Sequence, residues 1–280
     1  MKPRPELPFR RLRQSGFTLV ELALVLGVIV VLVSLLLPAI QQTREAARNY
    51  SCRNNLMQIG LALSNYESAW ECLPPGSVNP TRPIQHAVTG YQVGWGVRIL
   101  PHLDQQRAFE QFDFSAGAFD KRNSAVAATS LPMFRCPSMG SYAACHHDIE
   151  APIDIDNVGV FILNRAITRD EITDGISNTI YVGEIAGGAG FGWVAGNRDS
   201  LRNMGASLNS VRAAPGMGAV PVNSPELGVL GVGGFSSTHL GGASFLFGDG
   251  AVRFLSNEIS MTVYRRYGHR ADGAIPAGEF

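Results

Sequence analysis

One apolar run near the N-terminus limits what this chain can fold into. Residues 22–40 form nineteen consecutive positions without a charge, and Glu21 stands directly before them. As a helix the run measures about 28 Å at 1.5 Å per residue, close to a bilayer hydrocarbon core of about 30 Å. No other segment of the 280 residues is as apolar. We therefore predict a protein that crosses a membrane once.

The distribution of charge predicts the orientation of that helix. Residues 1–16 carry a net charge of +4, and the rest of the chain, with 18 basic and 22 acidic residues, carries −4. Basic residues flank the cytoplasmic end of a membrane helix, so we predict an inner-membrane protein with its N-terminus in the cytoplasm and its C-terminal domain periplasmic or extracellular. The acidic body offers no electrostatic reason to expect a nucleic-acid partner.

Glu21 separates three explanations of the apolar run. A secretory signal peptide needs a small-residue cleavage site after its apolar region, and residues 38–41 make a poor one. A plain membrane anchor explains the apolar residues but leaves the acid unexplained. A lone carboxylate in lipid costs about 2.5–3.5 kcal/mol, so such a residue is expected to be functional and to have a partner.

The segment Gly16-Phe17-Thr18-Leu19-Val20-Glu21 resembles the processing site of type IV prepilins and type II secretion pseudopilins. The resemblance implies that a prepilin peptidase cuts after Gly16 and that the new amine of Phe17 is methylated. Glu21 becomes the fifth residue of the mature chain, and Pro38 lies where this family often has a helix-loosening proline.

The same resemblance implies how copies of the chain associate. Glu21 of an incoming subunit would pair with the Phe17 amine of its neighbour and so set the register of assembly. The implied partners are the prepilin peptidase, other pilin-like subunits, a secretion or pilus assembly machinery and the inner membrane.

Hydrophobic periodicity continues beyond the apolar run. Ala47, Tyr50, Met57 and Leu61 form one stripe, and Cys52, Leu56, Ile59 and Leu63 form another. Prolines and a glycine at residues 73–76 end the pattern. The chain thus divides into a basic leader (1–16), a transmembrane helix (17–40), an extramembrane continuation of that helix (41–72) and a globular domain (73–280).

The globular part contains short predicted elements separated by turn residues. We expect strands at 157–163 and 178–185, and a hairpin whose strands 243–247 and 251–255 flank Gly248-Asp249-Gly250. Residues 186–234 are rich in Gly, Ala, Ser and Asn and predict a long irregular insertion. The fold class is α+β, with a long N-terminal helix against a mostly antiparallel sheet, as in pilins.

Three further segments, 52–63, 134–138 and 173–184, look like those of a large bacterial family of pilin-like proteins. Its members carry a C-terminal His-x9-Asp-Gly motif, which corresponds here to His239, Asp249 and Gly250 within the predicted hairpin region 235–255. Because the function of this family is itself largely unassigned, the resemblance supports architecture better than activity.

The four cysteines all lie after the membrane segment. An even number of cysteines in an oxidising compartment favours two disulfides over free buried thiols, and four cysteines allow three pairings. Since Cys52 and Cys136 both belong to the segments that resemble the family, the resemblance favours a Cys52–Cys136 bond, which leaves Cys72 with Cys145. The last two depart from the family pattern and suggest an extra crosslink.

Two other groups of residues invite chemical roles. In Cys145-His146-His147-Asp148 a metal site is weighed against a solvated loop, and the missing zinc-type spacing favours the loop. The C-terminal motif is weighed as a structural turn, as a hydrolase site with the serines at 236, 237 and 244, and as a calcium site through Asp249. Because no G-x-S-x-G surrounds these serines, we favour the interpretation of the motif as a structural turn.

These observations predict a non-enzymatic, pseudopilin-like structural subunit without a required cofactor, calcium at Asp249 being the one candidate. The alternative is a membrane-tethered module that binds an extracytoplasmic solute or polysaccharide. That alternative predicts a concave, aromatic-lined pocket involving Trp95 or Trp193.

Overall fold

The computed structural model describes residues 18–274, except 86, 139, 188–191 and 211–227. The predicted processing residues, Gly16 and Phe17, lie outside the described residues. The chain divides into two compact units, Met1–Ala47 and Arg48–Phe280. The long N-terminal helix runs through both of them.

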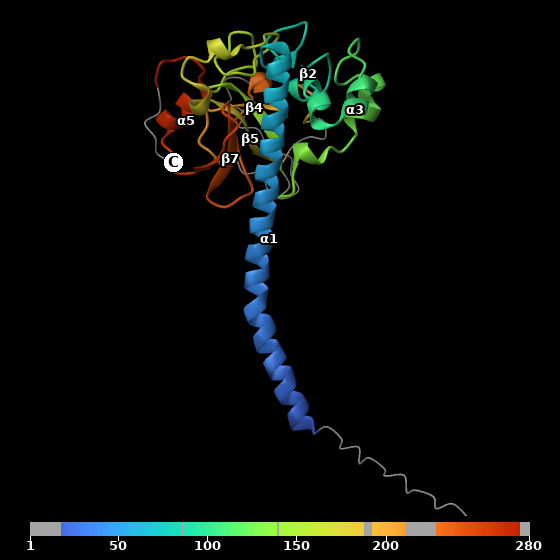
Figure 1. The fold of residues 1–280 in the computed structure, drawn as a ribbon, viewed down its shortest axis with the longest axis vertical. Coiled ribbons are helices and arrows are strands. Elements are labelled where there is room, and N and C mark those ends of the chain that lie inside the picture. Colours follow the sequence, from blue (N-terminus) through green and yellow to red (C-terminus); the bar gives the residue numbers. More distant parts are fainter. Residues whose placement is uncertain (1–17, 86, 139, 188–191, 211–227, 275–280) are drawn as a thin grey trace, which may run out of the picture. The chain divides into compact units, whose positions relative to one another are not determined.

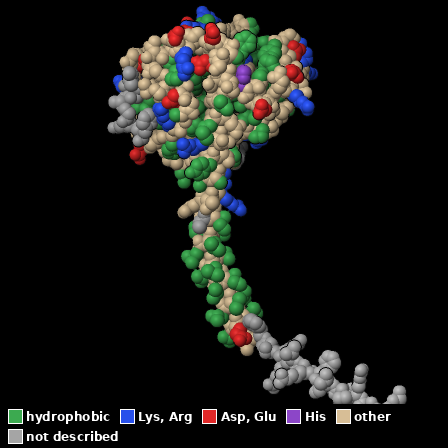
Figure 2. Space-filling view, in the orientation of Figure 1, with side chains coloured by type: hydrophobic (Ala, Val, Ile, Leu, Met, Phe, Trp, Pro, Cys, Tyr) green, Lys and Arg blue, Asp and Glu red, His purple; other side chains and the backbone are tan. Residues whose placement is uncertain are grey.

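Helix α1, Leu19–Trp70, is continuous over 52 residues and includes Pro38 (Figure 1). Its apolar side chains in the first unit are exposed, for example Leu24 at 69% and Leu35 at 69%, and Figure 2 shows hydrophobic side chains covering this part of the helix. Among the described residues, α1 is the one helix long and apolar enough to cross a membrane. These features are consistent with a single-pass membrane protein.

The start of α1 is capped by Thr18, the residue before the helix, together with Glu21 in its first turn. The backbone N–H of Thr18 donates to the Glu21 carboxylate at 2.9 Å, and the Thr18 hydroxyl donates to the same oxygen at 2.8 Å. The Glu21 N–H in turn donates to the Thr18 hydroxyl at 3.2 Å. Such reciprocal bonds satisfy donors that have no partner in a helix's first turn.

In the second unit, one of the two predicted stripes on α1 faces the core. Cys52, Leu56, Ile59 and Leu63 are at most 2% exposed, which confirms the stripe that they form. The other stripe stays open to solvent, with Leu61 64% exposed. Gly60 lets the helix approach the sheet closely, since a Cβ there would lie 2.7 Å from a methyl group of Leu246.

The remaining helices and strands are short. The strands are β1 (Ser77–Val78), β2 (Val93–Gly94), β3 (Arg135–Cys136), β4 (Gly140–His147), β5 (Ile180–Ala186), β6 (Leu201–Asn203), β7 (Gly242–Phe247) and β8 (Val252–Ser256). The helices after α1 are α2 (Trp95–Arg98), α3 (Gln106–Gln111), α4 (Ser124–Ala127) and α5 (Met261–Gly268). Short 3-10 turns join several of them.

The main sheet has the order β3-β4-β5-β7-β8, and its neighbouring strands in that order are antiparallel. The short strand β6 pairs with β4 in parallel. The described residues therefore show the predicted α+β arrangement, a long N-terminal helix with a mostly antiparallel sheet. Strands β4, β5 and β7 lie beside the C-terminal part of α1 (Figure 1).

Both faces of the central strands are covered. Along β4, Tyr142 and Ala144 join the larger core, which contains the buried stripe of α1, whereas Ala143 and Cys145 join a second core with α5. A strand covered on both faces shows a continuous apolar run instead of an alternating one. Strand β4 shows neither pattern, because it ends in His146 and His147, and residues 145–147 could therefore not be recognised as strand from the sequence.

Other sequence-based expectations had mixed outcomes. The hairpin around residues 248–250 is confirmed as β7–β8, and β5 confirms the strand expected at 178–185. The strand expected at 157–163 is wrong: residues 160–163 are buried but form only isolated bridges, such as Ser77 with Leu163. Burial explains their apolar character without a ladder of strand hydrogen bonds.

Candidate functional site

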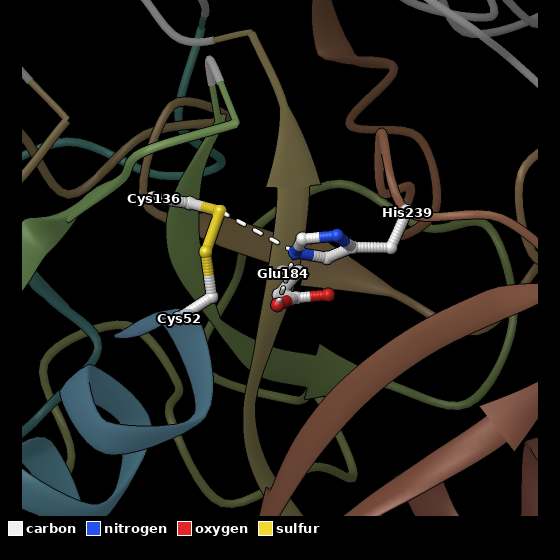
Figure 3. A group of neighbouring side chains, drawn as sticks. All are labelled: Cys52, Cys136, Glu184 and His239. Carbon is white, nitrogen blue, oxygen red and sulfur yellow. Dashed lines mark hydrogen bonds and ion pairs between the residues drawn. A yellow bond between two sulfur atoms is a disulfide. The ribbon is translucent and has the colours of Figure 1, made fainter. Parts of the chain in front are cut away.

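Four polar or sulfur-containing side chains meet in the core between α1 and the sheet. Cys52, Cys136, Glu184 and His239 each place one ligand-type atom within 4.8 Å of the others. All four are buried, with exposed fractions of 0%, 7%, 2% and 1% respectively. We call this group the buried cluster (Figure 3).

Each member of the buried cluster comes from a different element. Cys52 lies on the buried stripe of α1, Cys136 ends β3, and Glu184 lies in the middle of β5 opposite Tyr142 of β4. His239 lies in the loop before β7. The sheet register and the packing of α1 therefore bring together residues that are up to 187 positions apart in the sequence.

Cys52 and Cys136 form a disulfide bond, which confirms that pairing. The bond closes a loop with a sequence separation of 84 and attaches α1 to the edge strand of the sheet. The Tyr142 hydroxyl donates to the carbonyl oxygen of Cys52 at 3.0 Å, a second tie between α1 and the sheet.

The second predicted disulfide is wrong. Cys72 and Cys145 are both free thiols. Cys145 is fully buried in β4 on the face that packs against α5, whereas Cys72 is partly exposed just beyond the end of α1. The even number of cysteines predicted this bond, but the fold places the two residues in different surroundings and they do not form it.

His239 is placed between the disulfide and the glutamate. Its Nε2 atom lies 3.7 Å from the Cys136 Sγ and 3.7 Å from the Glu184 Oε1, and Figure 3 shows the ring pointing into this gap. The backbone N–H of His239 donates to the Ser237 hydroxyl at 3.1 Å, which holds the loop that carries the ring.

The two oxygens of the buried Glu184 carboxylate differ: Oε2 accepts a hydrogen bond, and Oε1 lies 3.7 Å from His239 Nε2 without one. The backbone N–H of Ser244 donates to its Oε2 atom at 2.9 Å, while Oε1 has no hydrogen-bond partner. Burial raises the pKa of Glu184, and the Ser244 N–H and the His239 ring oppose that rise. Leaving a buried polar atom unsatisfied costs about 1–3 kcal/mol, so Oε1 points to a role beyond packing.

The residues of the C-terminal motif lie in two places. His239 belongs to the buried cluster, whereas Asp249 and Gly250 form the turn between β7 and β8. Asp249 Oδ1 accepts from the Ala251 N–H at 2.9 Å, and its Oδ2 forms an ion pair with Arg253 at 2.9 Å. Gly250 has a φ of +82°, which suits glycine in this turn. Asp249 thus acts as a turn residue whose two oxygens both have partners, and among the described residues it belongs to no group of side chains that could hold a metal ion.

The serines near the motif do not form a nucleophile–base pair with His239 through their hydroxyls. Ser237 Oγ accepts from the backbone of His239, and Ser236 Oγ accepts from the Ala186 N–H at 3.0 Å. Ser244 contributes its backbone N–H to Glu184. The three serines therefore stabilise the loop that carries His239 and the carboxylate of Glu184.

The solvated loop expected at Cys145-His146-His147-Asp148 is wrong. The first three residues lie in β4, where Cys145 and His146 are fully buried. His146 Nδ1 lies 3.1 Å from the side-chain oxygen of Asn157, and His147 Nδ1 lies 2.5 Å from Asp148. Each imidazole group therefore contacts a neighbouring polar side chain, which gives it a structural role.

Glu184 is the member of the buried cluster that sequence reasoning missed. A signal was present, because Glu184 is the one charged residue in Ile180–Ala186, a strand that is otherwise apolar or small. A lone acid in a buried strand needs a partner, for the same reason as Glu21 does in lipid. Its partner, His239, could not be recognised from a position 55 residues away.

Comparison with known protein families finds a match over residues 41–262, to the family described as protein of unknown function (DUF1559). The chain belongs to this family. The DUF1559 match begins directly after the apolar run and includes all four residues of the buried cluster. A DUF1559 domain behind an apolar N-terminal helix fits a membrane-anchored extracytoplasmic protein. No curated protein and no solved structure matches the chain.

Proposed function

We propose that this DUF1559 chain is a non-enzymatic, pseudopilin-like structural subunit, cut after Gly16 by a prepilin peptidase and inserted in the inner membrane with its body outside the cytoplasm. One observation carries the proposal. A single helix begins with an exposed apolar half that contains one acid, Glu21, and continues into a half that is built into the core of an α+β body.

Glu21 supports assembly more than anchoring. In the single chain its carboxylate accepts hydrogen bonds from Thr18 alone, and no cation pairs with it among the described residues. Cleavage before Phe17 would create a positive amine near this carboxylate on an adjacent copy. A pair of opposite charges in a medium of low dielectric attracts strongly, whereas a lone acid there is costly.

The body supports the same role through the part of α1 that is built into its core. The Cys52–Cys136 bond and the buried stripe connect the helix to the sheet. The proposed partners are other pilin-like subunits and a type II secretion or type IV pilus-like assembly machinery.

The decisive experiment compares the wild type with Glu21→Gln in a host that contains a prepilin peptidase. Mass spectrometry of the mature N-terminus is expected to find methylated Phe17 in both proteins. Crosslinking in membranes is expected to capture multimers of the wild type and only monomers of Glu21→Gln, with equal membrane insertion. Glu110→Gln, which removes an exposed acid from the body, is the matched control.

Two results would overturn the proposal. A mature protein that keeps Met1 would exclude processing at Gly16. Multimers of Glu21→Gln in wild-type amounts would show that the acid has no part in assembly, and the helix would then be an anchor only.

One observation favours the alternative function, a tethered binding module. A cavity of about 400 Å³ lies between α1 and the β7–β8 hairpin, lined in part by Leu61, Glu67, Arg169, Tyr181 and Asp249. The predicted aromatic lining by Trp95 or Trp193 is wrong, because both indoles are buried in the core. Saturable binding of a soluble glycan, lost in Arg169→Ala, would support this alternative.

A further inference from the structure

We propose that the buried cluster is a redox-controlled metal site: when the Cys52–Cys136 disulfide is reduced, the two sulfurs, His239 and Glu184 bind one divalent transition-metal ion of the Zn²⁺ class. The inference concerns the core of the body and does not depend on the proposed assembly role.

Two of the donor spacings already match a tetrahedral site. Zinc binds sulfur at about 2.3 Å and histidine nitrogen at about 2.0–2.1 Å, so donors at the corners of a tetrahedron lie roughly 3.4–3.8 Å apart. His239 Nε2 lies 3.7 Å from Cys136 Sγ and 3.7 Å from Glu184 Oε1. The Cys52 sulfur, which is bonded to Cys136, lies within 4.8 Å of the other donors and moves away from Cys136 when the bond is reduced.

The missing hydrogen bond at the Oε1 atom of Glu184 is a second observation that points to a ligand. Glu184 is 2% exposed, and its Oε1 atom faces the cluster without a hydrogen bond. A carboxylate this deeply buried normally uses both oxygens. The Ser244 N–H holds Oε2 and so orients Oε1 toward His239 Nε2, as outer-shell partners orient metal ligands.

The donor set also selects the kind of ion. Two thiolates with one imidazole favour Zn²⁺ and related transition metals over Mg²⁺ or Ca²⁺, which prefer oxygen donors. Two thiolates and a carboxylate around a divalent ion leave one net negative charge.

The disulfide acts as the switch because its sulfurs cannot bind the ion as thiolates. A small dithiol transfers two electrons and two protons to the protein, the S–S bond breaks, and the dithiol leaves as its own disulfide. Metal binding then releases the two thiol protons to solvent, because thiolates are the ligands. Cys136 is 7% exposed and Cys52 0%, so we expect the dithiol to attack the sulfur of Cys136.

The test uses the detergent-solubilised full chain with Co²⁺ as a spectroscopic probe. Under anaerobic conditions the protein is reduced with a phosphine, desalted and titrated with Co²⁺, beside the oxidised protein. The reduced protein is expected to bind one equivalent, with the visible bands of tetrahedral cobalt and thiolate-to-cobalt charge transfer. The oxidised protein is expected to show neither, and Zn²⁺ is expected to displace the cobalt.

Variants locate the site. His239→Ala and Glu184→Gln are expected to weaken Co²⁺ binding by the reduced protein at least about tenfold, as loss of even outer-shell partners does. Cys72→Ser, which removes a free thiol outside the buried cluster, is expected to bind like the wild type. Circular dichroism of each reduced variant, with and without Zn²⁺, separates lost binding from lost folding.

Several results would overturn the proposal. Equal cobalt binding by oxidised and reduced protein would place the ion elsewhere, and so would spectra typical of octahedral oxygen ligation. Wild-type affinity in His239→Ala would remove the histidine from the site. A reduced protein that unfolds and is not refolded by Zn²⁺ would show that the disulfide has a purely structural role.

Discussion

The two halves of α1 have similar residues in opposite surroundings. Leu24 and Leu35 are each 69% exposed, whereas Leu56 and Leu63 are at most 2% exposed. Burial of a leucine side chain is worth about 1.5–3 kcal/mol, so the first half presents a large unfavourable surface to water and the second does not. The sheet covers one half. Among the described residues nothing covers the other half, which fits a helix that lies in a lipid bilayer.

The largest expected effect comes from removing the uncovered half. A chain that begins at Arg48 retains the buried stripe and the disulfide, and it is expected to move from the carbonate-washed membrane fraction to the soluble fraction. Quantitative blotting of the two fractions measures this. A truncated chain that remained with the membranes would show that the body itself binds lipid and that the comparison is wrong.

A leucine-to-alanine change in each half is expected to have unequal effects on the stability of the body. Leu56→Ala leaves a cavity in the core and is expected to lower the free energy of unfolding by about 2–5 kcal/mol. Leu24→Ala, in the uncovered half, is expected to change it by less than about 0.5 kcal/mol. Denaturant titration followed by the fluorescence of the buried Trp95 and Trp193 reports on the body. Equal losses would mean that both halves stabilise it.

The disulfide sharpens the comparison, because it joins only the covered half to the sheet. Replacing Cys52 and Cys136 by alanine is expected to lower the free energy of unfolding by about 2–4 kcal/mol, since the unfolded chain regains freedom. The same denaturant titration measures the loss. Cys72→Ser is the control and should leave the curve in place. If the double variant matched the wild type, the attachment of α1 would rest on packing alone.

The smallest effect is a difference in labelling that leaves the fold intact. Burial raises the pKa of both free thiols, but only Cys72 is partly open to solvent. A maleimide added to the native oxidised protein is therefore expected to modify Cys72 first, with Cys145 reacting only after denaturation. Peptide mapping identifies the labelled site. Rapid labelling of Cys145 would show that the α5 side of the sheet opens readily.

Much of this architecture follows local rules that a sequence displays. The apolar run, the stop at residues 73–76 and the Asp249-Gly250 turn each depend on residues close in the chain. The Cys52–Cys136 pairing was implied by family resemblance, whereas cysteine counting alone suggested a second bond that does not form. Counting failed because a disulfide needs two side chains close in space, which the number of cysteines does not specify.

The sequence by itself determined that a long helix with one acid near its apolar start precedes an α+β body. Only the tertiary structure decided that Glu184, His239 and the disulfide form one cluster, and that β4 is a buried central strand. The physical reason is the range of the interactions. A helix or a turn is stabilised by neighbours in the chain, but strand order and the packing of layers on a sheet depend on contacts between distant segments.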